Sequence, residues 1–307
     1  MDAFISPLFV NGLRGRVLHM PGPKHHSPEV LFVYGHHSSI ERWQGVAELM
    51  AQYAAVTMPD LPGFGGMDSL YKIDKLATLD NLADYLANFI AEYYPASKRF
   101  SIVGMSLGFV VVTRMLQRHP DVAPRVTTCI SLFGFAHKDD FILPLKRRRF
   151  GLRVAKLFSR PGFASAYRAV LLNRFVLSRA YHRTPNAREK FKNATTEEHA
   201  ANMDFEIKLW QNSDLRTYMQ TTAEFLQLDN TLAQINLPVY HVAVAKDRFF
   251  DNKTVEKHYA RIFTNVIALA ELQSANHAPT RIKTAAEAEA FIPPELLKKI
   301  AAAATNK

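Results

Sequence analysis

The sequence has little cysteine and no long hydrophobic segment. Cys129 is the only cysteine among 307 residues, which excludes an internal disulfide framework. Its apolar neighbours in TTCISLFG predict a small buried side chain rather than a reactive thiol. No stretch reaches the roughly 18 consecutive apolar residues of a membrane-spanning helix, and the N-terminus lacks a basic start followed by an apolar block. We therefore expect a soluble cytoplasmic protein, with a peripheral position at a membrane as an alternative.

Basic residues are concentrated in one segment. The formal net charge is +10, but residues 135–195 alone hold fifteen Lys and Arg residues against three Asp and Glu residues. A solvated outer face is the simplest interpretation of this segment. Its stretch LKRRRFGLRVAKLF interleaves basic and apolar residues at helical spacing, which favours an anionic membrane surface over nucleic acid. We expect no nucleic-acid partner.

Short apolar runs alternate with helical patterns from residue 29 onward. Near-continuous apolar runs, typical of strands buried on both faces, occupy residues 30–35, 54–60, 100–106, 127–134, 238–247 and 265–272. Helical patterns separate most of them, at residues 79–94, 106–119 and 252–262. This alternation predicts an α/β fold with a mostly parallel, doubly wound sheet.

The strand pattern stops after residue 135 and resumes near residue 231. Between these points only helical patterns occur, many of them basic and aromatic. We therefore expect a core formed by residues 1–135 and 231–307, interrupted once by helical residues 136–230. No internal repeat or low-complexity linker is present, apart from an alanine-rich tail.

Residues 100–109, FSIVGMSLGF, place a serine between two glycines at the junction of a strand and a helix. This context is typical of a nucleophile elbow, in which Ser106 occupies a tight, strained turn. Small residues are needed on both sides, here Gly104 and Gly108, because the strand and the helix approach closely. The pattern thus makes Ser106 a candidate nucleophile.

A serine hydroxyl needs a base, and the base needs a group that orients it. Asp247 ends the apolar strand in VAVAKD, and His277 lies in the loop after the next strand. The chain order Ser, Asp, His is the one expected of this elbow. Taken alone, Asp247 would cap the following helix and His277 would be an ordinary loop residue. Asp251 ranks second as the acid, and the pair Asp139 and Asp140, after the strand at 127–134, ranks third.

These motifs together resemble the α/β-hydrolase family. VLFVYGHHSSIERW resembles its oxyanion loop, MPDLPGFGG its Asp-x-x-Gly-x-Gly loop, GMSLG its elbow and SANHAP its histidine loop. The resemblance implies that Ser106 is the nucleophile, Asp247 the acid and His277 the base. It also implies an oxyanion hole formed by the backbone N–H groups of Leu107 and His36. Tyr34 stands at a position where the family usually has histidine, and Met105 at one where it often has histidine. Neither departure removes a catalytic group.

The loop after residue 35 can also be interpreted from its residues. Ser38 followed by Glu41 is a capping-box pattern, which predicts a helix that fixes the oxyanion loop. Adjacent histidines point apart, and no third ligand accompanies His36 and His37 at a recognisable spacing, so we expect no metal there. Asp60, within DLPGFG, is expected to be structural.

The resemblance implies a helical cap at 136–230 and a hydrolase that needs no cofactor or metal. We expect cleavage of a carboxylic ester with a hydrophobic acyl group through an acyl-enzyme. Amide bonds, as in proline iminopeptidase-like relatives, carbon–carbon bonds, and non-catalytic ligand binding are the alternatives. Epoxide hydrolases and haloalkane dehalogenases are disfavoured because those relatives carry aspartate at the elbow. Aromatic residues that would line the pocket or form the cap's own core are Phe141, Phe150, Phe158, Phe163, Phe175, Trp210 and Phe225.

Overall fold

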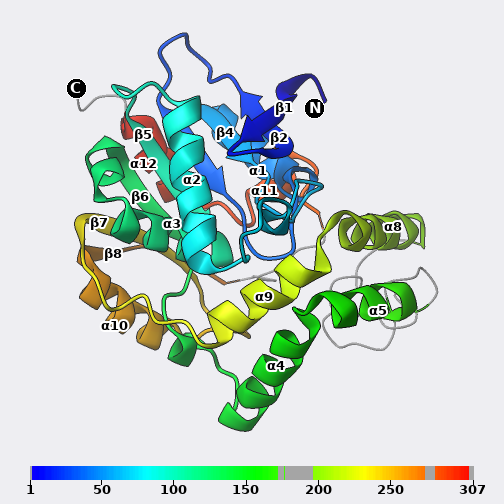
Figure 1. Ribbon diagram of the computed structural model, residues 1–307. Helices are drawn as coiled ribbons and strands as arrows, with labels where there is room; N and C mark the ends of the chain where they lie inside the picture. Colours follow the sequence, from blue (N-terminus) through cyan, green and yellow to red (C-terminus); the bar gives the residue numbers. More distant parts are fainter. Residues whose placement is uncertain (1, 172–175, 177–195, 274–280, 304–307) are drawn as a thin grey trace.

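An eight-stranded sheet forms the centre of the protein in the computed structural model, which describes residues 2–171, 176, 196–273 and 281–303 (Figure 1). Its strand order is β1-β2-β4-β3-β5-β6-β7-β8. Neighbouring strands from β4 through β3 to β8 pair in parallel, whereas β2 pairs antiparallel with β1 and β4. The strands are β1 (Ile5–Val10), β2 (Leu13–Met20), β3 (Glu29–Val33), β4 (Ala55–Pro59), β5 (Phe100–Met105), β6 (Val126–Leu132), β7 (Ile235–Val244) and β8 (Phe263–Leu272). The predicted α/β class and mostly parallel sheet are confirmed.

The inner strands are buried on both faces. Every residue of β4 and β5 is buried, which explains why their sequences are continuous apolar runs rather than alternating ones. Cys129 lies in β6 and is buried, as the sequence predicts. Burial raises the pKa of its thiol to about 12, so it is a packing residue at neutral pH.

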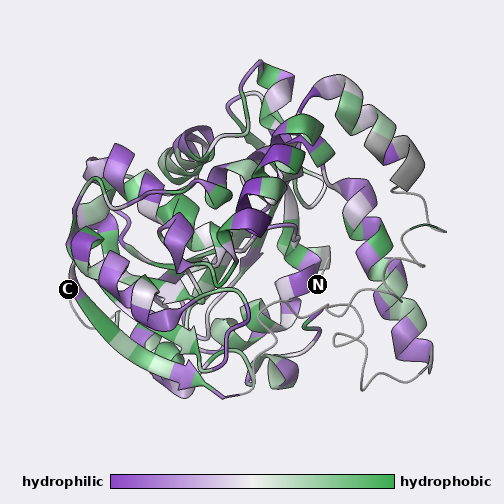
Figure 2. Ribbon diagram, turned by 90° about the horizontal axis from the view of Figure 1, so that it is seen from below, coloured by the Kyte–Doolittle hydropathy of each residue, from purple (hydrophilic) through white to green (hydrophobic). Residues whose placement is uncertain are grey.

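Helices cover both faces of the sheet, and α2 and α3 pack side by side on one of them (Figure 1). Figure 2 shows the helices banded in hydrophilic and hydrophobic colours, as expected when one side of each helix is buried. The α-helices of the core are α1 (Gln44–Ala51), α2 (Leu79–Tyr93), α3 (Leu107–Arg118), α10 (Asn252–Ile262), α11 (Ala285–Ala288) and α12 (Pro294–Ala302). Short 3₁₀ helices are η1 (Asp2–Phe4), η2 (Ile40–Trp43), η3 (Leu70–Ile73), η4 (Pro120–Arg125) and η5 (Lys138–Asp140).

Four α-helices of the described residues lie between β6 and β7 in the chain, after η5, and we call them the helical insertion. They are α4 (Leu145–Phe158), α5 (Pro161–Leu171), α8 (Thr196–Asn212) and α9 (Leu215–Leu226). They gather on one side of the molecule (Figure 1), with α9 against the loops at the carboxyl ends of the strands. A small separate core holds them together, formed by Ala164, Met203, Ile207, Leu215 and Met219. Within the described parts of the chain, no helix is both long and apolar enough to span a membrane.

The hairpin of β1 and β2 precedes the first strand expected from the sequence. Asn11 and Gly12 form its turn, with φ angles of 52° and 79°. An Asn-Gly pair is a strong hairpin signal because both turn residues need positive φ. That signal stands in the sequence and would have located the hairpin.

Candidate active site

Ser106 occupies the sharp turn between β5 and α3. Its φ of 49° and ψ of −121° place a non-glycine residue in a strained conformation. The Ser106 N–H donates to the Leu132 carbonyl oxygen at 3.0 Å, which fixes the turn to the end of β6. Leu107 begins α3, so its backbone N–H is one of the unpaired donors of the first helical turn. This is the geometry expected of a nucleophile elbow.

Close backbone contacts explain the glycines around Ser106. A Cβ atom on Gly104 would lie 2.6 Å from Phe109 Cα, and one on Gly108 would lie 2.2 Å from the Val33 oxygen. Real Cβ atoms do not approach backbone so closely, so a side chain at either position would force the strand and helix apart. Gly35 also packs against the elbow, because its Cβ would lie 3.2 Å from Ser106 Cβ. The loop after β3 therefore lies directly beside the serine.

A cavity of about 280 Å³ lies at this junction. Ser106, Leu107, Gly35 and His36 form part of its wall. Most of the remaining wall is aromatic and comes from Phe135, Phe141, Tyr218, Phe225, Phe249 and Phe250. Such a wall suits an apolar ligand group.

The aromatic residues expected in the insertion divide between several environments. Phe141 and Phe225 line the cavity and stack on each other with ring centroids 5.6 Å apart. Phe158 and Trp210 pack on the separate core of the insertion. The other described members, Phe150 and Phe163, are 69% and 47% exposed. Phe175 lies outside the described residues.

The side chain of His36 anchors the loop after β3 to the insertion. Its Nε2 lies 2.9 Å from Thr221 Oγ1 and 3.3 Å from the Tyr218 carbonyl oxygen, both on α9. A carbonyl oxygen can only accept, so Nε2 carries the proton. The His36 ring also stacks on the Tyr218 ring at 4.5 Å. Burial lowers the pKa of His36 to about 4, so the imidazole is neutral at physiological pH.

The ring of the neighbouring His37 contacts the Trp210 ring of α8, with centroids 3.9 Å apart. It also lies 5.3 Å from the Tyr218 ring, so both adjacent imidazoles pack against Tyr218. Among the described residues, no group of three or more His, Cys, Asp or Glu side chains is arranged to hold a metal ion.

A buried polar cluster holds the base of the same loop. Asp60 accepts from the Tyr34 hydroxyl at 2.9 Å, from the Ile40 N–H at 3.2 Å and from Arg16 Nη2 at 2.8 Å. Burial raises the pKa of Asp60 to about 7, while the charge of Arg16 opposes that shift. The Tyr34 hydroxyl in turn accepts from the Leu61 N–H at 2.8 Å. Tyr34 thus ties the end of β3 to the DLPGFG loop, and the contacts of Asp60 are structural.

Glu41 and Ser38 do not form the capping box predicted from the sequence. The residue at the N-cap of η2 is Ser39, which makes no side-chain capping bond. Glu41 pairs instead with Arg16 at 2.6 Å, and Ser38 Oγ accepts from Trp43 Nε1 at 2.7 Å. A helical segment does begin there, as η2, but the capping box was wrong, because Arg16, 25 positions away, and the nearby Trp43 take the two side chains.

Arg42 and Glu206 form a second link between the loop and the insertion. Arg42 donates to the His37 carbonyl oxygen at 3.1 Å and to Glu206 Oε1 of α8 at 2.7 Å. Their side chains are only 6% and 1% exposed, so both charges are buried. Sequence reasoning missed this pair, because 164 residues separate its members and Glu206 lies outside the motifs.

Asp247 lies in the turn that follows β7. Its Oδ1 accepts from the Phe249 N–H at 2.7 Å and from the Phe250 N–H at 3.3 Å, which fixes the carboxylate at the carboxyl edge of the sheet. Phe249 and Phe250 line the cavity, so this turn is part of its wall. His277 lies outside the described residues, in a segment that follows β8.

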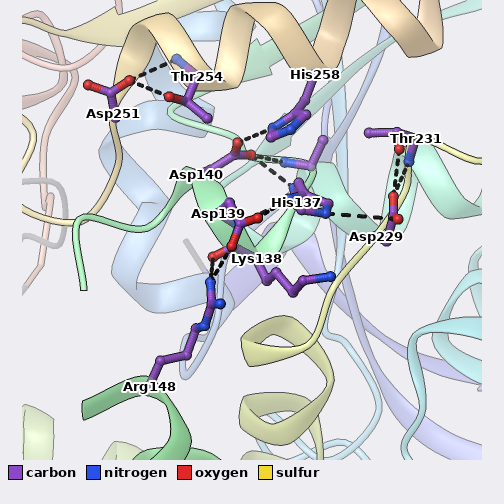
Figure 3. Close-up of polar contacts among 11 residues, drawn as sticks. His137, Lys138, Asp139, Asp140, Arg148, Asp229, Thr231, Asp251, Thr254 and His258 are labelled. Atoms are coloured by element: carbon purple, nitrogen blue, oxygen red, sulfur yellow. Dashed lines mark hydrogen bonds and ion pairs between the residues drawn. The ribbon is translucent and has the colours of Figure 1, made fainter. Parts of the chain in front are cut away.

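The lower-ranked acids all serve other contacts. Asp251 caps α10 by accepting from the Thr254 N–H at 2.9 Å. Asp139 pairs with Arg148 at 2.6 Å. Figure 3 shows these side chains together with Asp140, which turns toward His258 of α10.

Asp140 is fully buried within that cluster. Its Oδ1 lies 2.5 Å from His258 Nδ1, and its Oδ2 accepts from the Ala136 and His137 N–H groups at 2.8 and 2.9 Å. These contacts join η5 to α10 and satisfy the carboxylate (Figure 3). Asp247 differs from them in that its carboxylate accepts from the backbone N–H groups of Phe249 and Phe250, which both line the cavity.

Comparison with known proteins identifies the family. A model of the alpha/beta hydrolase fold matches residues 28–279. The chain belongs to this family. A search of the curated proteins finds no significant match.

Solved structures of the family resemble the chain over nearly its whole length. An N-acyl homoserine lactonase, AidH, is 17% identical with a TM-score of 0.64, over 99% of this chain and 98% of the other. Epoxide hydrolase A from Mycobacterium thermoresistibile is 16% identical with a TM-score of 0.63, over 98% of each chain. A thermophilic esterase from Thermogutta terrifontis is 16% identical with a TM-score of 0.60, over 96% of each chain. At these identities the likeness concerns the fold, which hosts several hydrolytic reactions.

Membership of the alpha/beta hydrolase fold family supports a hydrolase. The three similar structures act on different bonds, so the bond cleaved has to be argued from the residues of this chain.

Proposed function

We propose that this protein is a serine hydrolase that cleaves carboxylic esters with a hydrophobic acyl group. The observation that carries the proposal is the strained conformation of Ser106 on the wall of an aromatic cavity, beside Gly35 and His36. A strained nucleophile held at such a turn is aimed at a bound carbonyl carbon without a further conformational change.

In the proposed mechanism Ser106 Oγ attacks the ester carbonyl, and His277 accepts the serine proton. Asp247 orients His277 and stabilises its charged form. The Leu107 and His36 N–H groups stabilise the oxyanion, each contributing about 3 kcal/mol when preorganised. His277 then protonates the leaving alcohol, and water hydrolyses the acyl-enzyme in a second, equivalent cycle.

The helical insertion acts as a cap in this proposal. α9 supports it, because Tyr218 and Phe225 line the cavity opposite the serine. A volume of about 280 Å³ lies at the small end of ligand sites, which are about 300–1,000 Å³. We therefore expect a preference for acyl groups of short to medium length, with long chains extending out of the cavity.

Reaction with a fluorophosphonate probe tests the nucleophile. The wild-type protein should be labelled, and the Ser106→Ala variant should not. A wild-type protein that is folded, as judged by circular dichroism, yet remains unlabelled would contradict the enzymatic proposal and favour a ligand-binding role for the same fold.

A series of nitrophenyl esters tests the substrate class. Activity should rise from the acetate to medium-length acyl esters and fall for the sixteen-carbon ester. Hydrolysis of the matching anilides at a higher rate than the esters would instead identify an amidase.

A further inference from the structure

Helix α4 of the insertion has a strongly basic exposed surface. Between residues 145 and 160 the chain carries seven Lys and Arg residues and no Asp or Glu. Six of the seven are exposed, namely Lys146, Arg147, Arg149, Arg153, Lys156 and Arg160. Arg148 is the exception, since it points toward the core and pairs with Asp139. In the described parts of the chain, none of the six exposed cations forms an ion pair.

Large apolar side chains are exposed among these cations. Phe150 is 69% exposed and Leu157 is 38% exposed. The two are seven residues apart, so they lie on the same side of the helix, two turns from each other. Lys146 and Arg153 are also seven residues apart, and each lies three or four residues from Phe150. On a helix this spacing makes them neighbours, so a cationic row runs beside the apolar row. We call Lys146, Arg147, Arg149, Phe150, Arg153, Lys156 and Leu157 the outer face of α4.

The opposite side of α4 accounts for its attachment to the protein. Ala155 is buried, and a Cβ atom on Gly151 would lie 3.4 Å from Leu226 Cδ1 of α9. The start of α4 extends away from the sheet at the lower edge of the molecule (Figure 1). The outer face therefore points away from the helix that α4 packs on.

Apolar residues connect the start of α4 with the cavity that contains Ser106. Ile142 and Leu145, just before and at the start of α4, are 56% and 49% exposed. The Ile142 N–H donates to the Phe249 carbonyl oxygen at 2.8 Å, and Phe249 is itself 36% exposed and lines the cavity. Phe141, beside Ile142, lines the cavity too. An apolar strip thus runs from the exposed end of α4 to the cavity.

We infer that the outer face of α4 binds the surface of an anionic lipid bilayer. Lys and Arg side chains adsorb to anionic headgroups, and the exposed Phe150 and Leu157 enter the boundary between headgroups and acyl chains. The charge complementarity is supplied by the five exposed cations of this face, and α4 carries no acidic residue. In this orientation the apolar strip leads from the bilayer surface to the cavity.

Nucleic acid fits the surface less well. Single-stranded nucleic acid uses aromatic side chains as stacking platforms, and the outer face offers a single aromatic residue, Phe150. The neighbouring exposed apolar residues Ile142, Leu145 and Leu157 are aliphatic, which suits acyl chains rather than base stacking. The experiment therefore has to distinguish binding of nucleic acid from binding of an anionic bilayer.

Flotation with vesicles tests the inference on the full chain. Wild-type protein should float with vesicles of equal parts phosphatidylcholine and phosphatidylglycerol, and remain unbound with phosphatidylcholine alone. Each basic residue near an anionic surface contributes about fivefold in binding. The combined variant Arg147→Gln, Arg149→Gln and Arg153→Gln should therefore weaken binding about a hundredfold.

A matched variant separates a specific surface from overall charge. Lys24, Arg99 and Lys298 are exposed and lie outside the insertion, near the amino ends of the strands or on α12. Replacing these three by Gln removes the same charge and should weaken binding less than threefold. Equal losses for both triple variants would overturn the inference, as would wild-type protein that does not float.

The apolar part is tested with Phe150→Ser, matched by Leu232→Ser at a residue that is 80% exposed and lies away from α4. Phe150→Ser should weaken vesicle binding several-fold at high salt, where screening removes the electrostatic part, and Leu232→Ser should not.

Nucleic-acid binding is tested with a DNA or RNA oligonucleotide. The inference would be overturned if the wild type bound the oligonucleotide but not the vesicles, and if the α4 triple variant bound the oligonucleotide more weakly. Because flotation needs no catalysis, Ser106→Ala should bind vesicles like the wild type even if the proposed reaction is wrong.

Discussion

The contact between His36 and Thr221 gives a direct test of how the insertion affects catalysis. In the Thr221→Val variant the side chain keeps its branched shape and loses the hydroxyl that lies 2.9 Å from His36 Nε2. The buried Nε2–H is left with the Tyr218 carbonyl oxygen at 3.3 Å. Leaving a buried donor without its partner costs about 1–3 kcal/mol of stability. Because the longer contact with Tyr218 remains, we expect a cost near the lower end of this range.

Loss of this hydrogen bond should shift the His36 backbone N–H, which is an oxyanion donor in the proposed mechanism. Complete loss of one donor costs about 3 kcal/mol, so a partial displacement of about 1.4 kcal/mol lowers kcat about tenfold. KM should stay within about twofold, because the oxyanion forms only in the transition state. The assay is steady-state hydrolysis of the best nitrophenyl ester, together with inhibition by a boronic acid analogue, which should weaken by the same factor as kcat.

The adjacent Thr222 provides the matched control. Its hydroxyl donates to the same Tyr218 carbonyl oxygen at 2.7 Å. It has no contact with His36 among the described interactions, so Thr222→Val should leave kcat unchanged. Equal kcat values for the two valine variants, with both proteins folded, would refute the role of Thr221 in positioning the His36 N–H.

Three further predictions concern stability, each measured by urea unfolding. Gly108→Ala should lower the free energy of unfolding by about 3 kcal/mol or more, because its Cβ would lie 2.2 and 2.4 Å from two backbone oxygens. Gly162→Ala is the control, because a Cβ there would have nothing within 4 Å, and it should change the free energy of unfolding by less than about 1 kcal/mol. A similar loss for both variants would contradict the packing argument. Glu206→Gln should cost about 3 kcal/mol, because it removes the charge that faces the buried Arg42; a loss below about 1 kcal/mol would show that the pair behaves like a surface ion pair. Burial lowers the pKa of His241 to about 4, so the unfolded state binds more protons between that value and about 6.5, and stability should fall as pH falls through this range. His241→Gln should flatten that slope by about 1.4 kcal/mol per pH unit, and an unchanged slope would assign it to other groups.

Much of the fold was predictable because its signals are local. The parallel strands are buried on both faces, so their apolar runs are continuous and lie where the sequence analysis expected them. The elbow was likewise predictable, because the strand–GxSxG–helix pattern is contiguous in the sequence. Gly104 is required by its contact with Phe109 in the same turn, and Gly108 by its contact with the end of the adjacent strand β3. The first hairpin was missed although Asn11-Gly12 marks its turn, because β1 is an edge strand whose exposed residues leave no continuous apolar run.

The surroundings of the serine were less predictable because distant residues form them. His36 bonds Thr221 across 185 positions, and Arg42 bonds Glu206 across 164. Glu41 pairs with Arg16 across 25 positions instead of forming a capping box, and the local sequence of Glu41 does not show this. Which aromatic residues line the cavity also depends on how the insertion packs, and composition alone does not separate Phe141 from the exposed Phe150.

Helix α9 has a consequence for protein engineering. The same helix carries Tyr218 and Phe225 on the cavity wall and Thr221 on the side chain of His36. Mutations in α9 made to widen the range of accepted acyl groups would therefore also shift the oxyanion loop and reduce turnover. Phe249 and Phe250 line the same cavity from the turn after β7 and have no described contact with His36. Libraries directed at these two positions should alter selectivity while retaining more of the original rate.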